Sequence, residues 1–375
     1  MEKPKVAIVR GKFLNRYEMQ TYENLINKFY ITGFSSLTPI HDDFKFPIVK
    51  LLSPMDLPNF PYKMQILNRI FIDAHYLFGL EEKLKEFDIA HTAETYFHYT
   101  QQCLNAKKKG YVKKVVVTVW ENISFTNEGI RGRKGFKRRA IEEVDHFIAI
   151  SQKAKNALLK EGADAKKITI VNPGIDVDFF RVKNRNFESK KINILFVGRL
   201  EYCKGIYDFI SAISILVRKN NLKKYLLYFT FVGDGIEKKK ILEEEKRIGV
   251  DGFISHKTVS YENIIKEYKN ADIFVAPSKD TDTWQEQYNM ALLEAQSCGL
   301  PIIATKAGSI PENVGDAAIL VNQGDASALA IEIEKMILDP NIRVEYSKRA
   351  RKRAEEFHDA KIKAEEIAKV YNRVL

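Results

Sequence analysis

Residues 192–205 read INILFVGRLEYCKG, an apolar run that ends at a glycine and leads into a loop with two cations. The run predicts a strand over 194–197, and the apolar pattern from Ile206 onward predicts a helix directly after the loop. Seven similar runs occur elsewhere, at 6–9, 88–91, 115–119, 147–150, 227–232, 273–276 and 301–304. Strands that alternate with helices in this way are typical of an α/β fold with parallel sheets.

The chain is long enough for two domains. Its 375 residues exceed what one ordinary hydrophobic core holds. The strand-like runs form two groups, separated at 176–191 by DVDFFRVKNRNFESKK, which is polar and has no sustained period. We therefore predict an N-terminal domain over 1–178 and a C-terminal domain over 179–345. The helical pattern of 346–375 predicts closing helices that pack back toward the N-terminal domain.

The composition is that of an ordinary globular protein, with 45% apolar and 29% charged residues. The three cysteines, Cys103, Cys203 and Cys298, are odd in number and far apart, which argues against a disulfide framework and a zinc site. The first residues lack the apolar stretch of a secretory signal, and no apolar run is long enough to span a membrane. We expect a cytoplasmic protein.

The net charge of +11 is unevenly distributed. Residues 107–139 contain eleven Lys or Arg residues and two Glu residues, an excess of nine positive charges. Two interpretations stay open: a solvated helix surface, or a face for an anionic partner such as a phosphorylated acceptor or an anionic membrane. Apolar Phe125, Ile130 and Phe136 among the cations favour peripheral membrane docking as a hypothesis. Nucleic acid is not expected, because no recognition motif is present.

The loop after the predicted strand at 194–197 has the chemistry of an anion site. In open α/β sheets, ligands bind beyond the carboxyl ends of the strands. Gly198 allows a tight turn, and Arg199 and Lys204 place two cations at a strand end and a helix start, where backbone N–H groups also favour anions. This arrangement suits a diphosphate. The alternative is an ordinary surface loop with two cations.

A second loop, 278–294, reads SKDTDTWQEQYNMALLE and runs into a helix that we expect to end near Cys298. Glu286 precedes the helix and Glu294 lies more than a turn inside it, so the two carboxylates serve different parts of one elongated ligand. A carboxylate accepts hydrogen bonds from a vicinal diol. The alternative is a capping-turn charge at Glu286 and a solvated Glu294. Helix-start amides can face a phosphate, and they belong to Asn289, Met290 and Ala291.

The order of these motifs carries a family resemblance. GRL-x3-KG is followed by FVGDG at 231–235, ADIFVAPS at 271–278, E-x7-E from Glu286 to Glu294, and CGLPIIAT at 298–305. This ordered set resembles the retaining GT-B glycosyltransferases of family 4, the glycosyl transferases of group 1. The resemblance covers about 192–338 and extends back through VNPGID at 171–176.

The resemblance implies two Rossmann-like domains that face each other across a cleft. It also implies a metal-independent hexosyltransferase that uses a UDP- or GDP-linked sugar, needs no other cofactor and retains the anomeric configuration. Arg199 and Lys204 would neutralise the donor diphosphate, Glu286 would hold sugar hydroxyls and Glu294 the ribose hydroxyls. The base-binding loop would be 256–260, with Thr258 or Val259 at the base. Further donor-binding positions are Gly11, Gly198, Tyr288, Asn289, Met290 and Ala291.

The sequence departs from the family pattern at two places. The usual Glu-Gly-Phe-Gly is Glu286-Gln-Tyr-Asn289 here, although Asn tolerates the left-handed conformation better than most residues. After the strand at 115–119 the family's usual His is replaced by Trp-Glu-Asn. Glu121 or Asn122 then becomes the candidate contact to the sugar or leaving group. The alternative is that Trp120 packs in the fold and Glu121 is solvated. His91 is a further candidate, although a strand-end His is more often structural.

Two patterns point to other chemistry and are set aside. Asp280-Thr-Asp282 and Asp176-Val-Asp178 spell D-x-D, the metal–diphosphate signature of another glycosyltransferase fold, but neither lies in that fold's context. VGDG at 232–235 resembles a dinucleotide fingerprint, but Lys238 occupies the third glycine position. We expect neither a metal nor a nicotinamide cofactor.

The acceptor is not specified by the sequence, and both a saccharide and a lipid-linked group are compatible with it. Alternative functions are another GT-B enzyme, namely a nucleotide-sugar epimerase or a sugar phosphorylase. A basic membrane- or nucleic-acid-binding protein with a vestigial donor site is the alternative from a different class.

Overall fold

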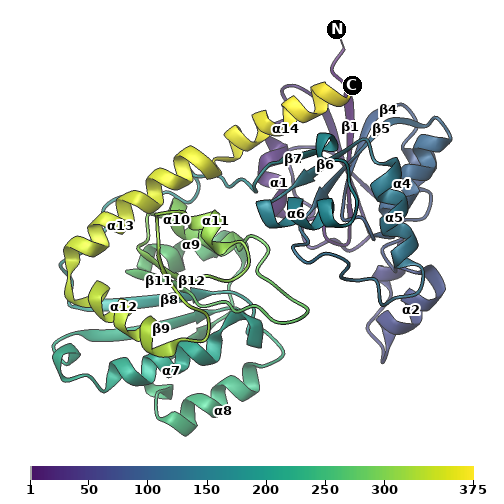
Figure 1. Cartoon of the computed structure of the whole chain (residues 1–375). Coiled ribbons are helices and arrows are strands. Elements are labelled where there is room, and N and C mark those ends of the chain that lie inside the picture. Colours follow the sequence, from purple (N-terminus) through teal and green to yellow (C-terminus); the bar gives the residue numbers. More distant parts are fainter. Residues whose placement is uncertain (1) are drawn as a thin grey trace. The chain divides into compact units, whose positions relative to one another are not determined.

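The computed structural model describes residues 2–375 and divides into two compact units. The first unit contains the chain through Gly174 together with Ala360–Leu375, and the second contains Ile175–Asp359 (Figure 1). The chain therefore leaves the first unit once and returns to it with its last helix.

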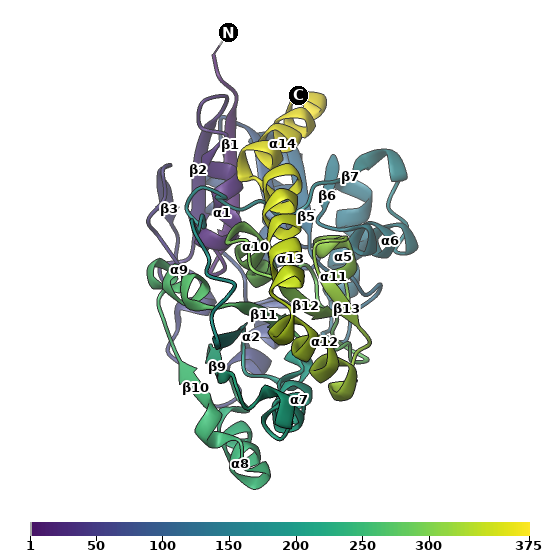
Figure 2. The ribbon, with the colours of Figure 1, turned by 90° about the vertical axis from the view of Figure 1, so that its left-hand side faces the viewer.

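The first unit is built on a seven-stranded parallel sheet in the order β3-β2-β1-β4-β5-β6-β7. Figure 2 shows β3, β2 and β1 side by side. The sheet grows outward in both directions from the β1/β4 pair, which is its topological switch point. The strands are β1 (Lys5–Gly11), β2 (Tyr30–Ser35), β3 (Ile48–Lys50), β4 (Phe87–Ala93), β5 (Val112–Val119), β6 (His146–Ala149) and β7 (Ile168–Ile170).

Helices follow most of these strands, as parallel connections require. They are α1 (Arg16–Glu23), α2 (Lys63–Phe71), α3 (Leu80–Lys83), α4 (His98–Lys108), α5 (Arg133–Glu143), α6 (Gln152–Lys160) and α14 (Ala360–Val374). The C-terminal α14 lies beside α1 and buries Ile367 and Tyr371 in the same core as Ile8 of β1 (Figure 2).

The second unit repeats the design with six parallel strands in the order β10-β9-β8-β11-β12-β13. Its switch point is the β8/β11 pair. The strands are β8 (Lys191–Val197), β9 (Leu226–Val232), β10 (Ile254–Lys257), β11 (Ile273–Ala276), β12 (Ile302–Thr305) and β13 (Ile319–Val321). The helices are α7 (Ile206–Val217), α8 (Lys238–Ile248), α9 (Tyr261–Asn270), α10 (Met290–Ser297), α11 (Ile310–Val314), α12 (Ala326–Leu338) and α13 (Pro340–Arg353).

The predicted fold class, α/β with two Rossmann-like parallel sheets, is confirmed. Within the described residues, all strand pairs of the two sheets are parallel, because each strand is followed by a crossover and not by a hairpin. The division between the units falls after Gly174, four residues before the predicted boundary at 178.

The predicted closing segment 346–375 is divided between the units. Residues 346–359 belong to the second unit, and only the part from 360 onward belongs to the first. The reason is visible at Arg351 of α13, whose guanidinium donates to the carbonyl oxygens of Ser297 at 2.6 Å and Val177 at 2.8 Å. These bonds tie α13 to its own unit. Among residues 2–375, no helix is long and apolar enough to cross a membrane.

Candidate functional site

The carboxyl ends of β8 and β11 bring the two predicted motif loops together. Ile194 of β8 pairs with Ile273 of β11, so the loops that follow these strands begin side by side. Lys204 lies in the first loop and Glu286 in the second, 82 residues later. This is the switch point of the sheet, where α/β proteins bind ligands.

Lys204 and Glu286 form a buried ion pair. Lys204 Nζ lies 2.7 Å from Glu286 Oε2, and the two side chains are only 13% and 5% exposed. Ser278 Oγ donates to the same oxygen at 2.8 Å, and Asn289 Nδ2 approaches it at 3.3 Å. The ring of Trp284 lies 4.7 Å from Lys204 Nζ. Glu286 is therefore a fixed carboxylate inside the site, which excludes a solvated charge in a capping turn.

Glycines let the loop backbones touch each other at this site. Gly205 has φ of +69°, and a Cβ there would lie 1.7 Å from the carbonyl oxygen of Pro277 after β11. Gly308 has φ of +48°, and a Cβ there would lie 2.0 Å from the carbonyl oxygen of Glu286. Any side chain at either glycine would push the loops apart. The two contacts thus hold the backbones that carry Lys204 and Glu286.

Helix α10 begins at Met290 and ends at Ser297, so the predicted helix start and end are confirmed. Its N-cap, Asn289, has φ of +50° and ψ of +85°, in the left-handed region. Asn fills the position of the family's second glycine because its side chain tolerates this conformation. The amides of Met290 and Ala291 lie in the first turn of the helix, where an anion is favoured.

Glu294 lies inside α10 and is only 4% exposed, so the alternative of a solvated helix residue is wrong. Tyr268 of α9 donates a hydrogen bond from its hydroxyl to Glu294 Oε2 at 2.5 Å. Burial raises the pKa of Glu294 to about 7, although the hydrogen bond from Tyr268 lowers it. A buried carboxyl with one hydroxyl partner is suited to bind a further hydroxyl of a ligand.

The remaining predicted residues of the second unit lie around this centre. The Arg199 side chain is 59% exposed and pairs with Glu201 at 3.0 Å. Gly198 directly follows β8, and its amide donates to the Val232 carbonyl oxygen at 3.0 Å. Tyr288 is buried in the loop before α10. Thr258 and Val259 follow β10, two strands away from β8 in the sheet.

In the first unit, Gly11 ends β1 with φ of +54°, against the ring of Tyr99. Glu121 and Asn122 follow β5 and are half-buried. Glu121 Oε1 accepts from the Ile123 amide at 3.1 Å, and burial raises the pKa of Glu121. Glu121 is therefore partly buried, which argues against the interpretation of a solvated charge. Asn122 Oδ1 accepts from Ser151 Oγ at 3.1 Å.

Glu94 is a residue that sequence reasoning missed. It follows β4 with φ of +57°, is 5% exposed, and accepts from the Trp120 amide through Oε1 at 2.8 Å. Its Oε2 is buried without a hydrogen-bond partner within residues 2–375. Burial and the nearby charge of Glu121 raise the pKa of Glu94 to about 8. The sequence signal that could have identified Glu94 is an acidic residue directly after an apolar strand.

His91 has a structural role. Its Nδ1 lies 2.6 Å from the Tyr371 hydroxyl and its Nε2 lies 2.7 Å from Thr118 Oγ1. Burial, with the charge of Arg10, lowers the pKa of His91 well below its usual value. Both ring nitrogens are occupied, so His91 is not free to contact a substrate.

Comparison with known proteins gives the family. The model of "Glycosyl transferases group 1" matches residues 177–353, and the model of "Glycosyltransferase Family 4" matches residues 44–179. Together the two models cover most of the chain. The chain belongs to the family 4 glycosyltransferases.

Relatives in sequence include the capsular polysaccharide biosynthesis glycosyltransferase CapM of Staphylococcus aureus, 29% identical over 66% of this chain and 68% of CapM. A D-inositol 3-phosphate glycosyltransferase of Segniliparus rotundus is 26% identical over 53% of this chain and 46% of its own length. A second one, from Corynebacterium jeikeium, is 28% identical over 64% and 60%. The chain thus spans about half to two thirds of the length of the curated relatives it matches.

Solved structures share the fold over the whole chain. Anabaena HepE in complex with UDP has a TM-score of 0.76 at 15% identity, over 99% of this chain and 100% of HepE. A glycosyltransferase of Rickettsia africae has a TM-score of 0.74 at 19% identity, over 100% and 99%. At these identities the likeness shows the GT-B fold alone.

Most cations of the basic segment 107–139 pair with acidic residues from other parts of the first unit. Seven of the segment's eleven cations form ion pairs, namely Lys107, Lys109, Lys113, Lys114, Arg133, Lys137 and Arg139. Two of these, Arg133 and Lys137, are buried in pairs with Asp73 and Glu161. They hold the fold and are not available to a surface partner. Within the described residues, the four cations of the segment outside these ion pairs are Lys108, Arg131, Lys134 and Arg138.

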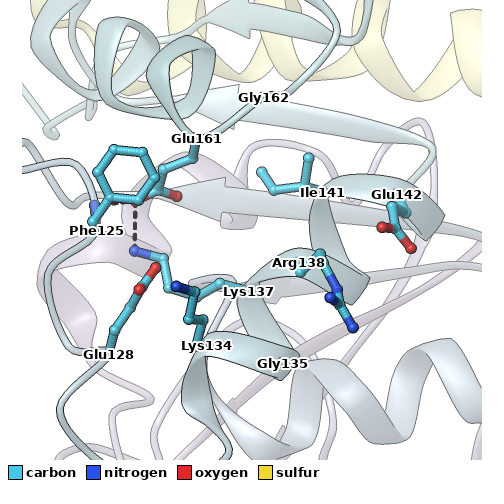
Figure 3. A pocket seen from close by; sticks show the side chains of 10 residues that line it. All are labelled: Phe125, Glu128, Lys134, Gly135, Lys137, Arg138, Ile141, Glu142, Glu161 and Gly162. Atoms are coloured by element: carbon cyan, nitrogen blue, oxygen red, sulfur yellow. Dashed lines mark hydrogen bonds and ion pairs between the residues drawn. The ribbon is translucent and has the colours of Figure 1, made fainter.

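A hollow of about 640 Å³ lies over α5 and the turn after α6. Lys134 and Arg138 line it, and Figure 3 shows Phe125 beside the Lys137–Glu161 pair. Phe125 is 56% exposed. Exposed cations beside an exposed aromatic ring are compatible with an anionic partner, while Glu128 and Glu142 at the same hollow reduce its net charge.

Proposed function

We propose that this chain transfers a glycosyl group from a nucleoside diphosphate sugar to an acceptor hydroxyl, with retention of configuration and without a metal ion. The observation that carries the proposal is the buried Lys204–Glu286 pair at the switch point of the second sheet. The structures of HepE in complex with UDP and with UDP-glucose support a nucleotide-linked donor. The base is uracil or guanine, and the acceptor is a saccharide or a lipid-linked group.

The site supports a distinct role for each residue. The donor diphosphate replaces Glu286 as the partner of Lys204, and Arg199 turns from Glu201 toward the phosphates. The released Glu286 carboxylate then accepts hydrogen bonds from the sugar hydroxyls, and Glu294 accepts them from the ribose. Catalysis rests on stabilising the negative charge that grows on the leaving diphosphate, with the first-turn amides of α10 adding to the two cations.

The proposed metal independence is supported by the hydrogen bonds that the first carboxylate of each D-x-D motif accepts from backbone amides. Asp280 Oδ1 accepts from the Gly308 amide at 2.9 Å, which helps to hold the Glu286 loop. Asp176 Oδ1 accepts from the amides of Asp178 at 3.0 Å and Phe179 at 2.9 Å. Both motifs therefore serve loop geometry, and we expect EDTA to leave activity unchanged.

Peripheral membrane association is also proposed, on the basis of exposed Arg131, Lys134 and Arg138 on and near α5. It would bring a lipid-linked acceptor to the enzyme. Lys108 on α4 is a fourth exposed cation of the same segment.

Thermal shift against UDP, GDP and their hexose conjugates tests the donor. A ligand at about 100 times its dissociation constant adds about 2.7 kcal/mol of stability. Glu294→Ala should abolish most of the shift, whereas Glu243→Ala on the exposed face of α8 should preserve it. No shift with any nucleotide in the wild type would contradict the proposal.

Product analysis with the donor that binds tests the reaction. Proton NMR of the product reports its anomeric configuration, which we expect to match that of the donor. A reaction that proceeds without an acceptor would indicate an epimerase, and one that consumes phosphate would indicate a phosphorylase.

A further inference from the structure

A buried cluster in the first unit contains an Asp–His pair that the proposed donor site does not use. His75 lies between α2 and α3, is 6% exposed, and places Nδ1 3.0 Å from Asp73 Oδ1. Asp73 is fully buried and also accepts from Arg133 Nη2 at 2.6 Å and from the His98 amide at 2.8 Å. The carboxylate is therefore compensated by a cation and an amide, and it fixes the orientation of the imidazole.

The cluster has buried polar atoms without a hydrogen-bond partner in the described part of the chain. They are His75 Nε2, Tyr99 OH and Arg133 Nε. Leaving a buried polar atom unpaired costs about 1–3 kcal/mol, so folded proteins rarely place several of them together. Their concentration around one Asp–His pair indicates a place where a polar ligand supplies the missing partners.

Aromatic side chains surround the imidazole. Phe13 stacks on His75 with ring centroids 4.8 Å apart, and Phe97 lies 4.6 Å from it on another side. Phe13 is the outer ring and is 40% exposed. An exposed ring beside a hydrogen-bonding group offers an apolar face and a polar atom together, which is what the C–H face and the hydroxyls of a sugar ring require.

The topology places this cluster at a ligand-binding position. Phe13 follows β1 and Phe97 follows β4, the two strands that form the switch point of the first sheet. Gly11, at the end of β1, lies against the ring of Tyr99. In open α/β sheets, the crevice beyond the carboxyl ends of such a strand pair is where ligands bind.

We propose that Phe13 and His75 form the acceptor subsite, where the ring of Phe13 packs on the apolar face of an acceptor sugar and His75 Nε2 accepts a hydrogen bond from one of its hydroxyls. Asp73 keeps the Nδ1 proton in place, so the lone pair of Nε2 is available to the ligand. Because His75 Nε2 is buried, the Phe13 ring shifts to admit the hydroxyl and stays in contact with the sugar ring. The inference rests on the proposed function and names the acceptor as a saccharide.

The test uses saturation-transfer NMR on the full chain in the presence of UDP, with methyl α-D-glucopyranoside, methyl β-D-galactopyranoside and methyl α-D-mannopyranoside as probes. Phe13→Ala removes the packing surface. His75→Asn keeps a side-chain donor near Asp73 and removes the ε nitrogen. Tyr30→Ala, at an exposed aromatic ring at the start of β2 in the same unit, is the control.

We expect at least one glycoside to bind the wild type and the Tyr30→Ala variant equally, and its dissociation constant to rise about tenfold in each of the other two variants. Binding that is the same in all variants, or no binding of any probe to the wild type, would overturn the subsite. Phe13 is a surface residue, so its variant remains informative if His75→Asn fails to fold. Calorimetry with UDP and GDP is run separately: absence of nucleotide binding would overturn the proposed donor function, whereas unchanged nucleotide affinity in the Phe13 and His75 variants isolates the acceptor subsite.

Discussion

At the scale of single residues, the donor site contains one exposed and one buried cation, and their substitution should have different consequences. Arg199 is 59% exposed, whereas Lys204 is paired with the buried Glu286. Arg199→Ala should lower kcat without changing the melting temperature. Lys204→Ala should lower kcat by about 10²–10³-fold, because charge on the leaving diphosphate grows in the transition state. It should also destabilise the fold by about 3–5 kcal/mol, since Glu286 loses its ion partner.

Steady-state kinetics and thermal unfolding of the two variants give both quantities. Lys239→Ala is the matched control, because its side chain is 90% exposed on α8. A donor KM that rises while kcat stays constant in the Arg199 and Lys204 variants would mean that these cations bind the ground state and do not stabilise the transition state.

Glu94 should make the stability depend on pH. Burial and the charge of Glu121 raise its folded pKa to about 8, above the 4.5 of an exposed Glu, although the hydrogen bond from the Trp120 amide and the charge of Lys137 lower it. Between pH 4.5 and 8 the folded state binds more protons than the unfolded state, so this carboxyl lowers stability as pH rises. Glu94→Gln keeps an acceptor for the Trp120 amide and should remove that loss.

Chemical denaturation at pH 5 and pH 8.5 measures the effect. The variant should exceed the wild type in stability by ~2–4 kcal/mol at pH 8.5 and by much less at pH 5. Glu142→Gln, on the exposed side of α5, should show no such difference. A gap that is equal at both pH values would show that Glu94 is ionised throughout.

At the scale of elements, the sequence predicted the inner strands well. The expected strands at 194–197 and 273–276 lie within β8 and β11, because central strands of a parallel sheet are buried on both faces and have continuous apolar runs. The strands β3, β7, β10 and β13 were not predicted, because they are the edge strands of the two sheets and, being only partly buried, have no long apolar run. Strand β2 was missed because Gly33 interrupts its run.

The residues of the candidate site could be predicted where they are close together in the sequence, but not where the fold brings distant residues together. Glu286, Asn289 and Glu294 are close in sequence, so the loop and helix that carry them were recognisable. The Lys204–Glu286 contact joins positions 82 residues apart and depends on strand order. Phe13 and His75 share no sequence pattern at all. Phe13 follows β1 whereas His75 lies between α2 and α3, so only the tertiary fold brings the two rings together.

Helix α5 and its flanking residues carry the membrane hypothesis, and the buried ion pairs decide how to test it. Reversing Arg133 or Lys137 would break the fold, so the informative variant is Arg131→Glu, Lys134→Glu and Arg138→Glu together. Each cation near an anionic surface contributes about 1 kcal/mol. The triple variant should therefore lose most sedimentation with anionic liposomes at low salt.

The control reverses Lys153, Lys160 and Lys166, which lie on α6 and the turn after it in the same unit. Its sedimentation should equal that of the wild type. Equal sedimentation of the wild type with anionic and neutral liposomes would instead favour a solvated face and a soluble acceptor.

At the scale of the whole molecule, the chain path makes the first unit depend on the C-terminus. Helix α14 buries Ala364, Ile367, Ala368, Val370 and Tyr371 in the core of the first unit. Burying these side chains contributes on the order of 5–10 kcal/mol, which is comparable with the entire stability of a typical domain. The Tyr371 hydroxyl also forms a hydrogen bond with Nδ1 of buried His91, at 2.6 Å.

We therefore expect residues 1–174 to remain without cooperative tertiary structure when expressed alone, and to fold when a peptide of residues 358–375 is added. The gain comes from covering the core beside α1, including Phe29, whose ring centroid lies 5.2 Å from that of Tyr371. Near-UV circular dichroism and thermal unfolding at increasing peptide concentration measure it, and the melting temperature should rise with concentration as mass action requires. A peptide with Ile367→Asp and Tyr371→Asp should have no effect. If the fragment alone already unfolds cooperatively at the melting temperature of the complemented form, α14 does not contribute to the stability of the first unit, and the prediction is wrong.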